Sequence, residues 1–175
     1  MNEALDELRR LVPPPEDPPP AADWAAAREK FGFDLPDDYR ALIDVYGAGL
    51  FDEELMVLAP GHPNENVDLL RQADRQLWGL RYVRDQAGEE LPYEPEPVSG
   101  GLIPWAITGN GDVCYWRVAD DPARWTVIVD EVRGGEWYPF DGTATEFLAG
   151  LFGGRVTAEF YGGDWPSDAP AFRRV

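Results

Sequence analysis

Histidine, cysteine, lysine and serine are scarce in this chain of 175 residues. His62 is the only histidine, Cys114 the only cysteine and Lys30 the only lysine. One histidine cannot form a zinc site of the paired-histidine type, and Lys30 follows no glycine-rich phosphate-binding loop. Ser99 and Ser167 are the only serines, and neither lies in a nucleophile elbow. The residue inventory therefore excludes the common catalytic and metal-binding motifs.

Long apolar runs are also missing. No segment approaches the length that a membrane span needs, and the opening "MNEALDELRR" lacks the apolar core of a signal peptide. A single cysteine cannot form a disulfide within the chain, which fits a reducing compartment. We therefore expect a cytoplasmic protein that contacts no membrane.

Positively charged residues are few. The chain has 15 lysine and arginine residues against 33 aspartate and glutamate residues, a formal net charge of −18 and a pI near 4.2. This balance disfavours nucleic acid, because nucleic-acid binding depends on cations that neutralise phosphates. It favours a basic protein partner, although an acidic surface can also serve solubility alone.

The N-terminal segment differs from the rest of the chain. Leucines at helical spacing predict a short amphipathic helix over residues 2–11. The following "PPPEDPPP", Pro13 to Pro20, forbids helix and is typical of a stiff, extended linker. We therefore expect a short helix with a proline-rich linker over residues 1–20 and one domain over residues 21–175.

Helical periodicity is clearest after Pro36, where Tyr39, Leu42, Ile43 and Tyr46 share one face. Helices are also predicted at three other places. These are residues 21–31, residues 66–84 with Val67, Leu70, Leu77 and Trp78 inward, and a helix opened by the capping box "TATE" at residues 143–146.

The stretch "IPWAITGNGDVCYWRV", residues 103–118, predicts a β-hairpin. A two-residue turn at Asn110-Gly111 would pair Trp105 with Trp116 and give Gly111 a positive φ. One face of the hairpin is then apolar and buried, and consists of Ile103, Trp105, Ile107, Cys114, Trp116 and Val118.

Further strands are expected at 55–59 and 125–132, and an edge strand at 137–140, where Pro139 cannot donate a ladder hydrogen bond. Together these patterns predict an α+β fold, in which a single domain holds an antiparallel-rich β-sheet with helices packed around it.

Acidic clusters are the candidate binding residues. The sequence places Asp52, Glu53 and Glu54 in one loop and Glu89 and Glu90 in another. Without histidines or calcium-loop spacing, these carboxylates predict either solvated loops or an anionic docking surface.

One arrangement resembles a metal-dependent nuclease. Asp112, followed by Glu131 and Arg133 on a neighbouring strand, has the acid, acid-x-basic order of such sites. An arginine stands where those enzymes use lysine, and the net charge opposes DNA, so a cryptic nuclease is only an alternative.

Three motifs in order resemble the SUKH superfamily, named partly for a yeast regulator of cell-wall assembly. They are "FGFDLPDDYRALIDVYGAGLFDEELMVLAPG", "GGLIPWAITGNGDVCYWRV" and "DDPARWTVIVDEVRGGEWYPFDGTATEFLAGLF", and the resemblance runs from about Trp24 to Phe152. Its motif positions, which look structural, are here Leu35, Pro36, Trp105, Asn110, Gly111, Asp112 and Trp116.

The resemblance implies a protein that works by binding. Bacterial members are thought to be immunity proteins against toxins, often nucleases, and other members are scaffolds or regulators. We therefore expect an immunity protein that occludes a basic cognate toxin, without catalytic residues, metal or cofactor. The alternatives are a scaffold for an endogenous protein and the cryptic nuclease.

Overall fold

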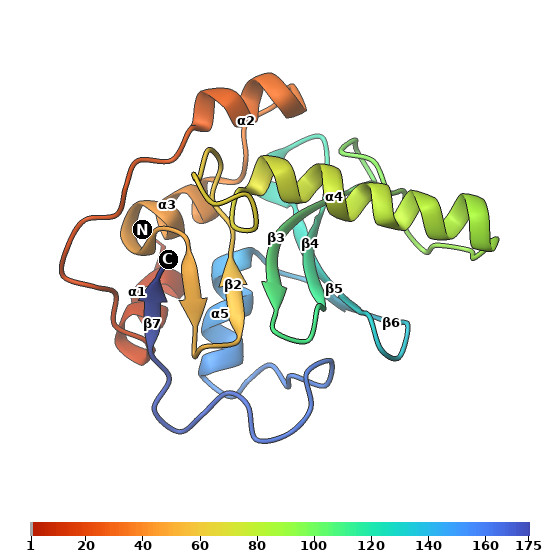
Figure 1. Ribbon diagram of the computed structural model, residues 1–175. Helices are drawn as coiled ribbons and strands as arrows, with labels where there is room; N and C mark the ends of the chain where they lie inside the picture. The colour runs from red at the N-terminus through yellow and green to blue at the C-terminus, as the bar shows by residue number, and fades with distance from the viewer. Residues whose placement is uncertain (1) are drawn as a thin grey trace.

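A seven-stranded antiparallel sheet with helices on both faces is the centre of the computed structural model, which describes residues 2–175 (Figure 1). The α+β class predicted from the sequence is confirmed. Five α-helices flank the sheet within the described residues, and short π and 3₁₀ turns connect some of the elements.

The strands follow the order β6-β5-β4-β3-β2-β1-β7 across the sheet. Their bounds are β1 Gly49–Phe51, β2 Leu55–Val57, β3 Leu102–Thr108, β4 Val113–Arg117, β5 Thr126–Glu131, β6 Glu136–Phe140 and β7 Phe172–Arg174. As Pro139 predicts, β6 is an edge strand. The other edge is β7, which pairs with β1 although the two strands lie far apart in the sequence.

The helices are α1 Glu3–Leu11, α2 Trp24–Phe31, α3 Asp37–Tyr46, α4 Leu69–Tyr82 and α5 Ala144–Phe152. A π-helical turn, Val83–Ala87, extends α4. The capping box that opens α5 is formed as predicted, because Thr143 and Glu146 bond each other's backbone N–H groups. The predicted inner face of α3 is also confirmed, since Tyr39, Leu42, Ile43 and Tyr46 are all buried.

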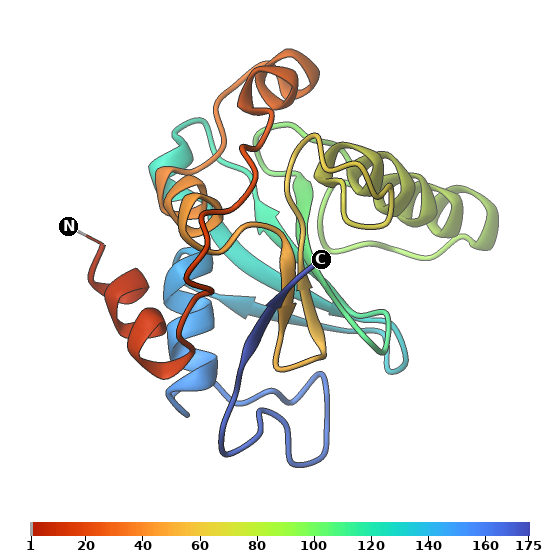
Figure 2. The same ribbon diagram turned by 60° about the vertical axis from the view of Figure 1, so that its left-hand side comes forward.

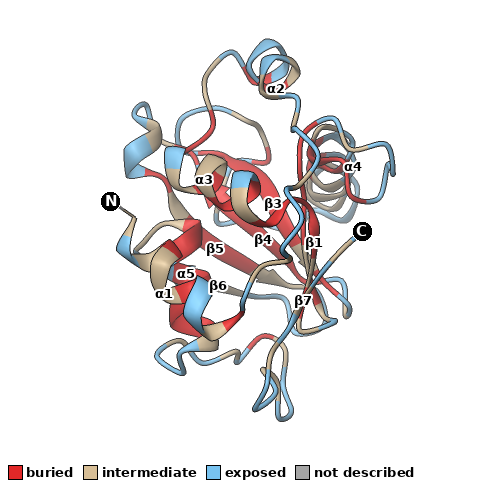
Figure 3. Cartoon of the chain, turned by 90° about the vertical axis from the view of Figure 1, so that its left-hand side faces the viewer, coloured by how far each residue is buried: buried red, intermediate tan, exposed pale blue. Residues whose placement is uncertain are grey.

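Two apolar cores lie on opposite faces of the sheet. The main core joins α1, α3 and α5 to the sheet (Figure 3). It contains Trp105 and Trp116, whose rings stack 6.2 Å apart. Tyr39 of α3 meets the Trp116 ring edge-on at 4.6 Å. On the opposite face, Leu77 of α4 covers a smaller core that includes Tyr115. Complete burial of both tryptophans is the outcome that the apolar hairpin pattern predicts.

The predicted pairing within the β3–β4 hairpin is wrong. The loop has three residues, Gly109–Gly111, closed by the Thr108 N–H to the Asp112 carbonyl at 2.8 Å and the Gly111 N–H to the Thr108 carbonyl at 3.0 Å. Trp116 lies opposite Ile103 rather than Trp105.

A β-bulge explains why the tryptophans still share a face. The register shifts between Pro104 and Ala106, so the extra residue, Trp105, enters the main core without a cross-strand partner. Beyond the bulge the alternation is inverted, so Ile107 pairs with Val113 of the smaller core. Ile107 is only partly buried and contacts both cores, which corrects the predicted apolar face at this position. The predicted positive φ of Gly111 is confirmed at 94°.

Two expectations for helix faces and strands also need correction. Trp78 of α4 points outward and is 61% exposed, although its apolar side chain predicted burial. The short strands β1 and β7 were not predicted, because three residues carry too little alternation to mark a strand.

The N-terminal segment packs on the rest of the molecule. Leu5 and Leu8 of α1 are buried and α1 packs against α5. The proline-rich segment that follows is fixed at two points, where the Tyr46 hydroxyl donates to the Val12 carbonyl at 2.6 Å and the Arg174 guanidinium donates to the Asp17 carbonyl at 2.9 Å. Leu5, Leu8 and Val12 therefore belong to the main core, and the proline-rich segment runs over the surface of the domain.

No helix among residues 2–175 is both long and apolar enough to cross a membrane.

Candidate partner-binding surface

Three hairpin turns and one long loop meet at one end of the sheet (Figures 1 and 2). The turns join β1 to β2, β3 to β4 and β5 to β6, and the loop connects α5 to β7. Hydrogen bonds link these segments directly. The Gly109 N–H donates to the Glu54 carbonyl at 2.8 Å, and the Asn110 side chain donates to the Tyr161 carbonyl at 3.5 Å and accepts from Arg133 at 3.3 Å.

We call this region the acidic end and define it as residues 52–54, 109–112, 130–136 and 159–168. These four segments hold one arginine, Arg133, and ten carboxylates, a formal charge of 1 − 10 = −9 and half of the chain's −18. The carboxylates are Asp52, Glu53, Glu54, Asp112, Asp130, Glu131, Glu136, Glu159, Asp164 and Asp168. The antiparallel sheet order concentrates this charge, because it places all three turns at the same end of the strands.

The predicted acidic loop, Asp52 to Glu54, is the β1–β2 turn. Asp52 and Glu53 have positive φ angles of 50° and 60°. Two of its carboxylates hold the C-terminal part of the chain, since Asp52 accepts from the Ser167 N–H and hydroxyl at 2.7 Å each and Glu53 pairs with Arg173 at 2.8 Å. Asp52 and Glu53 therefore hold the C-terminal part of the chain in place, in addition to any role in binding a partner.

Three side chains at the acidic end have raised pKa values, which burial causes first and nearby carboxylates increase. Burial and the nearby charges of Glu54 and Asp112 raise the pKa of Tyr161 to about 12. Burial and four carboxylates, Glu131 first among them, raise the pKa of Tyr138. Half-buried Asp130 has its pKa raised to about 6 by burial and then by Asp112 and Glu131. The carboxylates at this end are therefore close enough to repel one another.

Asp112 is fully buried and serves the hairpin. Its carboxylate accepts a hydrogen bond from the Thr108 hydroxyl at 2.8 Å and another from the Val132 N–H at 3.2 Å. Both oxygens are thereby engaged in tying the β3–β4 turn to the β5–β6 turn. These two hydrogen bonds explain why an aspartate follows Asn110-Gly111, and the explanation needs no bound metal ion.

Glu89 and Glu90 lie elsewhere. They are exposed and follow Gly88 at the free end of α4, which projects away from the acidic end in both views (Figures 1 and 2). The structure therefore separates the two acidic groups that the sequence offered as one set of candidates.

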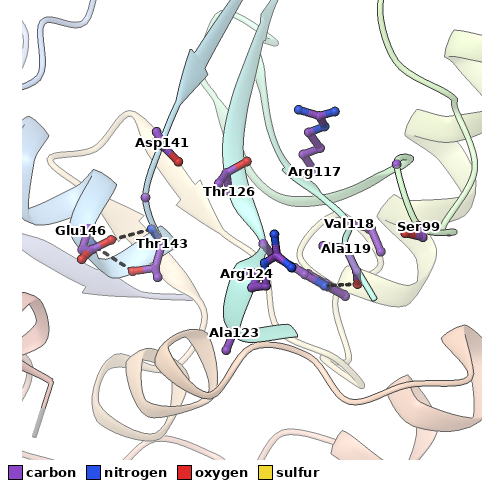
Figure 4. A pocket seen from close by; sticks show the side chains of 13 residues that line it. Ser99, Arg117, Val118, Ala119, Ala123, Arg124, Thr126, Asp141, Thr143 and Glu146 are labelled. Carbon is purple, nitrogen blue, oxygen red and sulfur yellow. Dashed lines mark hydrogen bonds between the residues drawn. The ribbon is translucent and has the colours of Figure 1, made fainter. Parts of the chain in front are cut away.

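A surface hollow of about 770 Å³ lies near the opposite end of β4 and the start of α5 (Figure 4). Arg117 and Arg124 line one part of it, and Asp141, Thr143 and Glu146 line another. Glu146 is held in the capping box of α5, and the indole N–H of Trp125 donates to the Ala119 carbonyl at 2.8 Å. Thr143, Glu146 and the Trp125 indole are therefore engaged in helix capping and loop packing.

Metal-binding and nucleophilic groups are dispersed. Among residues 2–175, no three His, Cys, Asp or Glu side chains lie where they could hold one metal ion. Cys114 is buried, which raises the pKa of its thiol and disfavours the reactive thiolate. His62 accepts from the Asn64 N–H at 3.1 Å and contacts the Val175 carbonyl at 3.1 Å.

Comparison with known families identifies the chain. The model of the SMI1 / KNR4 family (SUKH-1) matches residues 18–150, about three quarters of the sequence. The chain belongs to this family. The resemblance seen in the sequence motifs is thereby confirmed. No curated protein and no solved structure matches the chain.

The SUKH-1 match ends inside α5, so part of the acidic end lies outside it. Glu159, Asp164 and Asp168 belong to the loop beyond residue 150, which packs onto the family domain through Asp52 and Asn110. Sequence reasoning also missed Asp130, Glu136 and these three loop carboxylates as candidates. Acids at both ends of a predicted β5–β6 turn were an available signal, but only the sheet order brings them beside residues 52–54.

Proposed function

We propose that this SUKH-1 protein is a non-enzymatic binding protein of the immunity type, which neutralises a cognate toxin by covering a basic surface with its acidic end. The observation that supports the proposal is the concentration of half the net charge in four short segments at one end of the sheet. A basic active site or substrate groove, such as that of a nuclease toxin, has the complementary charge.

The acidic end is suited to rapid capture of such a partner. Opposite charges steer diffusional encounter and raise the association rate, while exposed rim charges add less to the lifetime of a complex. Glu53, Glu136, Glu159, Asp164 and Asp168 are exposed there, and short hydrogen bonds hold the underlying turns. A rigid anionic surface loses little conformational entropy on binding.

Occlusion, rather than catalysis, fits the chemistry of the described residues. The acid closest to a nuclease-like position, Asp112, uses both oxygens in hydrogen bonds within the fold. We therefore propose that purified protein with Mg²⁺ or Mn²⁺ cleaves neither DNA nor RNA. Cleavage that Asp112→Ala abolishes while the fold is retained would support the nuclease alternative instead.

The direct test is growth rescue against a candidate toxin domain, taken from any toxin gene that neighbours the gene for this chain. Co-expression of the wild-type chain should restore growth, and a double variant, Glu136→Gln with Glu159→Gln, should rescue less well. Both side chains are exposed and both lie near Tyr138, so the variant removes two charges of the acidic end without emptying a buried site.

A matched control distinguishes the two acidic groups. Glu89→Gln with Glu90→Gln removes the same charge at the free end of α4, and this variant should rescue as well as wild type. Equal loss in both variants would indicate a general charge effect, and loss only in the control would move the toxin surface to α4. Failure of the wild-type chain to bind any neighbouring toxin, together with capture of an endogenous regulator, would favour the scaffold alternative.

A further inference from the structure

The outer face of α4 carries an exposed aromatic pair. Trp78 and Tyr82 are 61% and 54% exposed, and their rings stack 5.3 Å apart at an interplanar angle of 26°. Tryptophan and tyrosine are enriched among the hot-spot residues that carry most of the energy of protein–protein binding. No part of residues 2–175 covers them.

Charged residues extend this pair into a stripe. Arg71 and Arg75 precede the aromatic pair and Asp85 and Glu89 follow it, each at a spacing of three or four residues from its neighbour. Such spacing puts residues 71–82 on one side of the α-helix, while Asp85 lies in the π-helical turn and Glu89 follows Gly88, whose left-handed conformation ends the helical turns. All four charged residues are exposed, so the stripe runs basic, aromatic, acidic along the free side of the helix.

Residues of the stripe that are equally far from residue 80 form complementary pairs, one aromatic and two of opposite charge. In an antiparallel pair of α4 helices related by a two-fold axis at that residue, Trp78 of one copy faces Tyr82 of the other. Arg75 then lies opposite the π-helical turn that holds Asp85, and Arg71 lies opposite the segment after Gly88 that holds Glu89, because the two members of each pair are equally far from residue 80 in the sequence. We propose that the protein self-associates through this face of α4, with a second copy of the chain as the partner.

The remaining contacts of α4 leave this face available. Lys30 pairs with Asp74 at 2.6 Å, and Arg81 and Arg84 bind Glu96 and Glu94 of the returning loop. These contacts lie to the sides of the stripe, whereas Arg75 within the stripe already donates to the Asn66 side chain at 3.0 Å. Within residues 2–175, neither Arg71 nor Glu89 has an ion-pair partner, whereas Asp85 already pairs with Arg84 at 2.8 Å. The Arg71–Glu89 pair is therefore the one that dimerisation newly satisfies.

The expected dimer is weak and leaves the proposed toxin surface open. A helix of 14 residues is about 21 Å long, so two such helices bury less than the roughly 1,000 Å² that a stable interface requires. The acidic end lies away from α4, which separates the most charged parts of two copies that each carry −18. The inference is independent of the toxin proposal, since it concerns a different face.

Sedimentation velocity over a range of protein concentrations tests the proposal. Wild-type protein should show a concentration-dependent shift towards dimer. Trp78→Ala with Tyr82→Ala should raise the dimer dissociation constant at least about tenfold, because both hot-spot rings are lost. Circular dichroism should show an unchanged fold, since both side chains are exposed. A wild-type chain that remains monomeric at every concentration contradicts the proposal.

Charge reversal tests the predicted pairing itself. Arg71→Glu and Glu89→Arg should each weaken self-association, because each places like charges opposite one another twice in the symmetric pair. An equimolar mixture of the two variants should associate like wild type, since the mixed dimer restores both opposite-charge pairs. Arg124→Glu, the same change at an exposed site away from α4, should have no effect. A mixture that associates no better than the separate variants would overturn the antiparallel arrangement.

Discussion

The Thr108 hydroxyl and the Asp112 carboxylate lie 2.8 Å apart across the β3–β4 turn, and both groups are buried. The same hydroxyl accepts the Asp112 N–H at 3.0 Å. The turn is thus closed by side chains as well as by the backbone. This local pair orients a carboxylate that also bonds the next turn at Val132.

Removing the Thr108 hydroxyl should therefore destabilise the protein. Thr108→Val keeps the shape of the side chain but leaves a buried carboxylate with one hydrogen bond fewer, which should lower the free energy of unfolding by about 1–3 kcal/mol. Urea denaturation followed by tryptophan fluorescence measures the change. Thr157→Val, at an exposed position, should leave the midpoint nearly unchanged. Equal effects of the two substitutions would contradict the assigned role of Thr108.

Two glycines should respond to alanine in opposite directions. Gly111 has a φ of +94° and open space where a side chain would lie, so Gly111→Ala should cost about 1 kcal/mol through backbone strain alone. Gly79 lies inside α4 without positive φ and also faces open space, so Gly79→Ala should gain about 0.5–1 kcal/mol. Thermal melts of both variants beside wild type test the pair. Stabilisation by Gly111→Ala would show that this turn tolerates an L side chain.

Asp130 should make stability depend on pH. Its pKa in the folded protein is about 6, above that of an unfolded aspartate, because burial and the charges of Asp112 and Glu131 oppose its ionisation. The folded state therefore holds the proton more tightly, and this carboxyl's destabilising contribution is complete above pH 6 and disappears as the pH falls towards 4.

Asp130→Asn should accordingly stabilise the protein near pH 7 by about 1 kcal/mol, a value reduced for the partial exposure of the side chain. The difference from wild type should vanish near pH 4. Denaturation curves at both pH values measure it. A variant that is less stable than wild type at neutral pH would mean that the carboxylate stabilises the folded state.

Association with a basic toxin should be steered by charge. The on-rate should fall steeply as salt concentration rises, while the off-rate changes less. A stopped-flow salt series should give a shallower slope for Glu136→Gln with Glu159→Gln than for wild type. Neutralising Asp52 and Glu53 is a poorer test, because these residues also bind Ser167 and Arg173. A flat series would leave shape and apolar contacts as the basis of recognition.

Local signals explain which parts of the fold could be predicted. The helix after Pro36, the capping box at Thr143 and the buried tryptophans all depend on residues within a few positions of one another. The bulge at Trp105 could not be predicted, because an added residue inverts the strand's alternation without changing its composition. The helical periodicity predicted a buried Trp78, because it shows only that apolar side chains share one face of a helix. Periodicity does not distinguish a face that packs in the core from a face that binds a partner.

The acidic end could be predicted only in part. Asp52, Glu53 and Glu54 are adjacent in the sequence and were recognised as a cluster. Their neighbours Glu136 and Glu159 lie far from them along the chain and join them only through the sheet order and the α5–β7 loop. In the sequence Glu89 and Glu90 form an acidic cluster like that of residues 52–54, and only the direction in which α4 projects distinguishes the two clusters.

The pairing of β7 with β1 has a consequence for how the chain is made. Until residues 172–174 have been synthesised, β1 is an open edge strand whose Phe51 lacks its contact with Phe172. Such an edge can capture another strand, and the risk lasts through translation of the long intervening segment. Of the strands of this sheet, β7 leaves the ribosome last, after the glycine- and proline-rich loop that precedes it. Once β7 pairs with β1, the backbone groups of β1 are no longer available to another strand.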